Sequence, residues 1–116
     1  MNLEQIAQAA LNRDSLRLRE LVQELLDTYP NLGEVPEPTF AQESKVILAG
    51  LLELLAERRK QLPPWWTQKV GGMLEPFFML ESTYTMPRLR DYCQRESPLP
   101  LRKRGLYAPP NFLEFA

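Results

Sequence analysis

The sequence predicts an all-α fold: a small helical bundle with a helical hairpin and a long central helix, followed by a C-terminal half of short helices and an ordered irregular tail. Two observations support this prediction. Leucine and alanine recur at helical spacing through residues 3–61, and residues 30–38 interrupt the pattern with three prolines and a glycine. At 116 residues, of which 44% are apolar, the chain is a single domain able to bury a core.

The first two helices form the predicted hairpin. Asn2 is the expected N-cap of the first helix, and the polar residues 12–15 break the apolar pattern because their side chains compete for backbone hydrogen bonds. The second helix ends before Pro30, since the residue preceding a proline avoids helical geometry. A DNA-binding helix-turn-helix is the less favoured interpretation, because the break lacks a glycine and acidic residues follow the arginines of the second helix.

A long central helix is the predicted core of the fold. Thr39 and Gln42 match a capping box at its start, and we expect the helix to run to about Gln61. Its apolar residues cover more than half of its circumference. Glu53 and Glu57 lie one helical turn apart within it. We interpret them as part of a solvated polar stripe rather than a metal-binding or proton-sharing pair, because no other ligand converges on them.

Residues 63–116 are the predicted second half of the domain, after a first half of residues 1–62. Two prolines open a short helix that ends at the glycine pair of residues 71–72. Of the two tryptophans at its start, Trp65 and Trp66, we expect one to be buried and the other to be half exposed.

The apolar residues 73–84 are the hardest to assign. Pro76 prevents a regular helix through them, so we expect an ordered segment that lies over the bundle. A further helix starts at residues 85–87 and ends near residue 97. It is expected to turn three residues inward: Leu89, Tyr92 and Cys93.

The absence of histidine and the single cysteine exclude several classes of chemistry. One chain can form neither a disulfide, nor a Cys/His zinc site, nor a Ser–His or Cys–His nucleophile pair. We therefore expect a non-catalytic protein without a metal or cofactor. The longest apolar stretch is far shorter than the roughly 20 residues of a membrane span, and no basic leader precedes it, so we expect a cytoplasmic protein that does not contact a membrane.

Charge is distributed unevenly, although the net charge is only −1. Residues 1–62 carry seven lysines and arginines against ten acidic residues, and residues 63–116 carry seven against five. The positive excess forms a basic cluster, which comprises Arg88, Arg90, Arg95, Arg102, Lys103 and Arg104. Three interpretations stay open: a surface for nucleic-acid phosphates, a clamp on an acidic pocket of another protein, and a solvated surface whose arginines pair with the acidic first half. The net charge argues against nucleic acid as the main partner.

The C-terminal tail is too apolar to remain free in solvent. Its apolar side chains are Leu106, Tyr107, Phe112, Leu113 and Phe115. We expect them to dock, with docking on the chain's own bundle favoured over docking on a partner. In this interpretation the tail presents Arg102, Lys103 and Arg104, and Tyr107 and Phe112 join the basic cluster as partner-binding residues.

The stretches LPPWWTQKVGGMLEPFF, RESPLPLRKRG and LYAPPNFLEFA carry a family resemblance. Residues 62–116 are similar to the C-terminal part of small bacterial antitoxin-type proteins encoded beside nucleotidyltransferase-like toxins. The matching positions are Pro64, Trp66, Thr67, Pro76, Phe77, Ser97, Pro98, Arg102, Arg104, Pro110, Phe112 and Leu113. Such segments often follow a DNA-binding domain, which residues 1–61 do not resemble. The resemblance therefore implies neutralisation of a partner rather than autoregulatory DNA binding.

These observations predict a non-catalytic interaction protein, an antitoxin-like partner of a toxin or nucleotidyltransferase. Its arginines would engage an acidic, metal-binding active site in the partner, with the tail aromatics as anchors. The alternative is a nucleic-acid-binding regulatory protein that uses the basic cluster. Homodimerisation through exposed aromatic residues is a further hypothesis.

Overall fold

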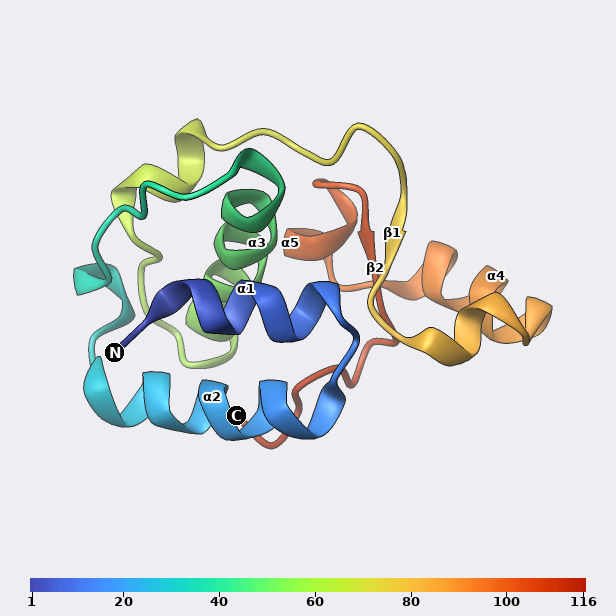
Figure 1. The fold of residues 1–116 in the computed structure, drawn as a ribbon, viewed down its shortest axis with the longest axis horizontal. Helices are drawn as coiled ribbons and strands as arrows, with labels where there is room; N and C mark the ends of the chain where they lie inside the picture. The colour runs from blue at the N-terminus through green and yellow to red at the C-terminus, as the bar shows by residue number, and fades with distance from the viewer.

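The computed structural model describes all 116 residues and confirms the all-α fold. Helices α1 (Leu3–Leu11) and α2 (Ser15–Thr28) form the hairpin, and α1 also packs against α3 (Gln42–Arg58), which lies behind it in Figure 1. The remaining elements are η1 (Leu32–Glu34), η2 (Trp65–Lys69), β1 (Phe77–Phe78), η3 (Glu81–Tyr84), α4 (Pro87–Glu96), α5 (Leu99–Arg102) and β2 (Leu106–Tyr107). None of the helices combines the length and the apolarity that crossing a bilayer requires.

The start of each early helix follows from local chemistry. Asn2 accepts a hydrogen bond from the backbone N–H of Glu4 at 3.0 Å, which confirms the predicted cap of α1. Asp14 caps α2 in the same way. The predicted capping box at Thr39 is wrong, because α3 begins at Gln42 after Ala41 and no side chain caps it. Burial of α3 supplies the stability that a cap would otherwise provide.

Two helices end in the same backbone motif. The residues after the ends of α1 and α3, Arg13 and Lys60, adopt left-handed φ angles of 55° and 57°. In each case the following N–H group turns back to a carbonyl in the last turn of the helix, as in a Schellman motif. Glycine usually occupies this position, since a side chain there is strained. This turn ends α3 at Arg58, three residues before the predicted end at about Gln61.

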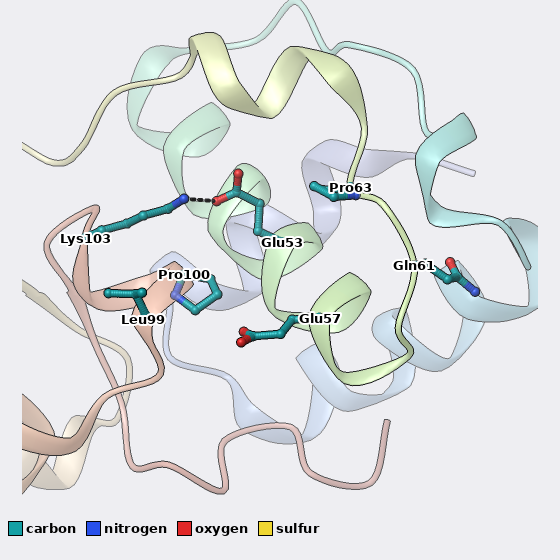
Figure 2. Close-up of a pocket in the computed structure, with 7 residues that line it drawn as sticks. All are labelled: Glu53, Glu57, Gln61, Pro63, Leu99, Pro100 and Lys103. Carbon is teal, nitrogen blue, oxygen red and sulfur yellow. Dashed lines mark ion pairs between the residues drawn. The ribbon is translucent and has the colours of Figure 1, made fainter.

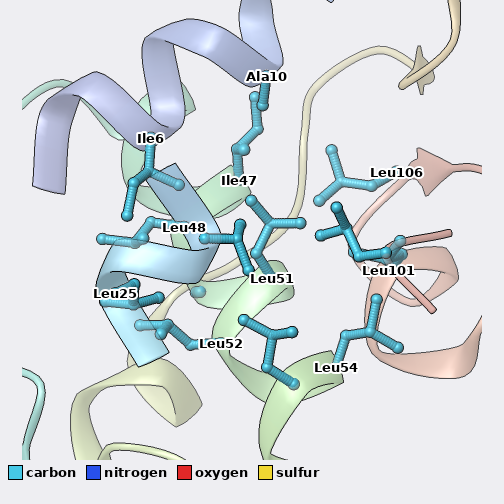
Figure 3. Packing of buried hydrophobic residues seen from close by; sticks show 14 of the residues in the cluster. Ile6, Ala10, Leu25, Ile47, Leu48, Leu51, Leu52, Leu54, Leu101 and Leu106 are labelled. Atoms are coloured by element: carbon cyan, nitrogen blue, oxygen red, sulfur yellow. The ribbon is translucent and has the colours of Figure 1, made fainter. Parts of the chain in front are cut away.

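Helix α3 is the centre of the core. Every residue from Val46 to Ala56 is buried, including Gly50 and Glu53. Figure 3 shows that its leucines are surrounded by side chains from α1, α2, α5 and β2. Burial of each of these leucines stabilises the fold by about 1.5–3 kcal/mol.

Gly50 marks the contact between the two halves. A Cβ atom at this position would lie 2.9 Å from Leu106 Cδ1 and 3.2 Å from Leu101 Cδ2. The absence of a side chain therefore lets α5 and β2 approach the backbone of α3 closely.

The second half contains more regular structure than the sequence predicts. Strands β1 and β2 pair in parallel, with Phe77 opposite Leu106 and Phe78 opposite Tyr107. Neither this pair nor α5 was expected, because two-residue strands and a four-residue helix leave no periodic pattern. Within residues 73–84, Met73, Phe77, Met79 and Leu80 pack on the main apolar cluster, as predicted for this segment, whereas Leu74 is exposed.

The two tryptophans divide as expected. The Trp66 side chain is buried, and its indole N–H donates to the Val35 carbonyl at 2.9 Å. Trp65 is 67% exposed, and the Lys69 ammonium lies 4.5 Å from its ring centroid. The buried indole thus fixes the connector of residues 30–38 against η2.

Helix α4 projects from the body of the domain beyond the small sheet (Figure 1). Its main packing partner is η3, and Cys93 is its one buried residue. Burial raises the pKa of the Cys93 thiol. The inward orientation predicted for Tyr92 is wrong, because the side chain is 42% exposed.

Candidate functional site

The predicted partner-binding residues separate into two groups, one engaged within the fold and one free. Arg104 belongs to the first group, since it is only 5% exposed. Its guanidinium donates to Glu53 Oε1 at 2.9 and 3.2 Å, to the Thr67 carbonyl at 2.8 Å, and to the Gly71 carbonyl at 3.0 Å. The Val70 carbonyl also accepts from it. Arg104 therefore joins α3 to the segment around η2, and the expectation that the tail presents it to a partner is corrected.

Glu53 is the counterpart of Arg104. Its side chain is buried, so the expectation that it lies on a solvated stripe is wrong. Its Oε1 atom also pairs with the Lys103 ammonium at 3.1 Å. A single carboxylate inside a continuous apolar run of a helix indicates that the carboxylate is buried and paired with a cation. The reason is that an unpaired buried charge is strongly unfavourable.

A cleft of about 270 Å³ opens beside this ion pair (Figure 2). Lys103 and Glu53 close one end of it, and the free carboxylate of Glu57 lies one turn along α3. No group of three or more acidic, cysteine or histidine side chains is arranged to hold a metal ion. The ammonium of Lys103 offsets the negative charge of the cleft, so nothing in it favours a particular ligand.

The tail is docked on its own domain. Phe112 and Leu113 are each 8% exposed and belong to the main apolar cluster. The Arg58 guanidinium donates to the Phe112 carbonyl, and to the Pro110 carbonyl at 3.0 Å. Burial lowers the pKa of Arg58. Phe112 is therefore a structural anchor and does not face a partner.

Tyr107 and Arg90 belong to an aromatic layer over the small sheet. The rings of Tyr107 and Phe78 lie 5.3 Å apart, and the Arg90 guanidinium lies 4.5 Å from the Phe78 centroid. Tyr84 packs edge-on against the same phenylalanine ring. These contacts hold α4 to the body, so both predicted site residues have structural roles.

Arg13 is a residue that the sequence analysis did not single out. Its guanidinium donates to the Phe78 carbonyl at 2.8 Å and to the Tyr84 hydroxyl at 2.5 Å. It also lies 4.4 Å from the Phe77 centroid. Arg13 thereby connects the end of α1 to the aromatic layer, a contact between residues far apart in the chain that no local pattern reveals.

Arg88 and Arg95 form the free group. Both are exposed, and neither takes part in any ion pair or cation–π contact of the structure. Their spacing of seven residues places both on one face of α4. The outer face of α4, as we define it, comprises Arg88, Asp91, Tyr92 and Arg95. Arg102, at the end of α5, is also exposed but donates to the Arg95 carbonyl at 2.8 Å.

Only part of the basic cluster therefore forms a shared exposed surface, which is the outer face of α4 extended by Arg102. Arg90, Lys103 and Arg104 are engaged within the fold. Comparison of the chain with protein-family models, with curated proteins and with solved structures finds no match.

Proposed function

We propose that this is a non-catalytic interaction protein that binds an acidic surface of a partner protein through the outer face of α4. The observation that carries the proposal is the pair of exposed, unpaired arginines on a helix that projects from the body. Guanidinium groups bind carboxylates through paired, charge-assisted hydrogen bonds. The outer face of α4 therefore has the side chains needed to bind a partner surface that is rich in carboxylates.

The residue types of this face are those that dominate binding energy at protein interfaces. Arginine and tyrosine are enriched among interface hot spots, and Tyr92 lies between the two arginines.

A second copy of the chain fits this face poorly. In an antiparallel pairing of two α4 helices, Arg88 of one copy would lie opposite Arg95 of the other. A parallel pairing would also place like residues together. Both arrangements oppose like charges, so a different protein is the better occupant.

Nucleic acid is also the weaker candidate. Binding to the DNA backbone depends on lysine and arginine contacts to phosphates, and a protein with about 6–10 such contacts binds with a steep salt dependence. The outer face of α4 carries two arginines and one carboxylate, and the net charge of the chain is −1. The supply of free cations is therefore small for phosphate binding.

The class of partner rests on the resemblance of residues 62–116 to antitoxin-type proteins. A toxin of the nucleotidyltransferase type would present carboxylates that bind metal ions in its active site. Arginines inserted among them would compete with the metal ions. The protein would in this way neutralise the enzyme without performing chemistry itself.

Capture of the tagged protein from its native cells tests the proposal. We expect the wild type to retain a stoichiometric protein partner, and Arg88→Glu/Arg95→Glu to retain at least about tenfold less, because charge reversal at an interface costs several kcal/mol. The matched control is Arg59→Glu/Lys60→Glu, which reverses two exposed charges on the first half.

Three outcomes would contradict the proposal. One is recovery of no stoichiometric partner by the wild type. Another is equal loss of the partner in both double variants. The third is retention on a DNA or heparin column that weakens steeply with salt, which would favour the nucleic-acid alternative.

A further inference from the structure

A second hollow lies where the end of α1, the start of α3 and residues 73–77 meet. Its volume is about 380 Å³, and it is more enclosed than the cleft beside Glu53. Leu11, Met73 and Phe77 line it as half-buried apolar side chains. This volume is within the range of about 300–1,000 Å³ that is usual for binding pockets. We refer to it as the Leu74 groove.

The exposed residues of the groove combine apolar surface with negative charge. Leu74 is 104% exposed, so the fold leaves a whole leucine side chain in solvent. Glu43 and Glu75 are exposed beside it, and neither makes an ion pair. No lysine or arginine lines the groove.

Arg13 contacts the wall of the groove but forms no ion pair with Glu43 or Glu75. Arg13 stacks on Phe77 and donates to the Phe78 carbonyl and to the Tyr84 hydroxyl. It therefore holds the wall of the groove in place. Neither Glu43 nor Glu75 is therefore paired with a cation of the chain.

We propose that the Leu74 groove binds a segment of a partner protein that carries an aliphatic or aromatic anchor flanked by lysine or arginine. The apolar lining would accept the anchor, and the two glutamates would pair with the flanking cations. This chemistry is opposite in sign to that of the outer face of α4. The groove is thus a second surface, independent of the proposed function.

Two blocked peptides test the proposal: acetyl-Lys-Leu-Phe-Lys-amide and its acidic counterpart acetyl-Glu-Leu-Phe-Glu-amide. Each is titrated into the isotopically labelled protein, and amide shifts are followed by NMR. We expect the basic peptide to shift the amides of Leu11, of residues 73–75 and of Phe77. It should bind about fivefold or more tightly than the acidic peptide, because it gains two surface charge pairs and avoids charge repulsion.

Charge variants separate this groove from the other surfaces. Glu43→Lys/Glu75→Lys is expected to reverse the preference between the two peptides. Glu57→Lys, which changes an exposed carboxylate in the other cleft, is the matched control and should leave the preference unchanged. Arg88→Glu/Arg95→Glu should also leave it unchanged, so failure here and failure of the proposed function are distinguishable.

Three results would overturn the inference. The first is shifts that fall outside the groove or are absent at millimolar peptide. The second is equal affinity for both peptides. The third is concentration-dependent shifts of the groove residues without any peptide, which would show that a second copy of the chain occupies it.

Discussion

The two halves of the molecule are stabilised in different ways. Residues 1–62 form helices whose own backbone hydrogen bonds satisfy their carbonyls, and leucine-rich faces bury them against each other. Residues 63–116 contain short elements joined by irregular segments, and arginine side chains satisfy several of their carbonyls. The donors are Arg13, Arg58, Arg102 and Arg104.

This difference explains why only part of the basic cluster in the sequence is free to bind a partner in the structure. An irregular segment leaves carbonyls without partners, and a guanidinium supplies five donors in a rigid fork. Part of the arginine content of the second half is therefore structural. Charge counting along a chain overestimates a binding surface wherever regular structure is sparse.

The strongest way to break the second half is to remove Arg104. Arg104→Met leaves Glu53 buried with only the exposed Lys103 as partner, and it removes the donor for three carbonyls. We expect a loss of about 3–5 kcal/mol in the free energy of unfolding, measured by urea denaturation. Arg102→Met, which removes one hydrogen bond at an exposed site, should cost less than about 1 kcal/mol. Equal losses in the two variants would show that the buried network is not the source of stability.

The contact between the halves is broken by adding volume at Gly50. Gly50→Val inserts a side chain where Leu101 and Leu106 already pack, so α5 and β2 must move away from α3. We expect a loss of about 1–3 kcal/mol in the free energy of unfolding. The control is Gly71→Val, because no atom lies within 4 Å of a Cβ at that position. A neutral Gly50→Val would mean that the two halves do not depend on this close approach.

The smallest expected effect comes from replacing the residues with left-handed φ, Lys60 after α3 and Arg13 after α1, by glycine. Lys60→Gly should stabilise the fold by up to about 1 kcal/mol, since it relieves the strained φ and Lys60 is exposed and forms no ion pair. Arg13→Gly relieves the same strain but loses the contacts with Phe78 and Tyr84, so we expect net destabilisation. Thermal denaturation of both variants measures whether each substitution raises or lowers the stability of the fold. Stabilisation by both would show that the contacts of the Arg13 side chain contribute less than its strained backbone costs.

The sequence predicted three local features correctly, because each depends on residues a few positions apart. They are the N-cap at Asn2, the proline before η2 and the apolar faces of the first half. The capping box at Thr39 had the right residues and still did not form. The exposure of Tyr92 and the burial of Arg104 were predicted wrongly for one reason. Each depends on what packs against the residue from elsewhere in the chain.

The sequence by itself determined the all-α class, the connector at residues 30–38, the central position of α3 and the docking of the apolar tail, because hydrophobic periodicity and proline placement act locally. Only the tertiary structure decided which cations of the basic cluster are free. Glu53 and Arg104 are in contact although 51 residues separate them in the sequence. Arg13 and Phe78, in the aromatic layer, are in contact across 65 residues. Contacts of that range depend on how the helices pack, and one-dimensional spacing carries no record of them. After those contacts have formed, Arg88 and Arg95 on the outer face of α4 remain exposed and unpaired.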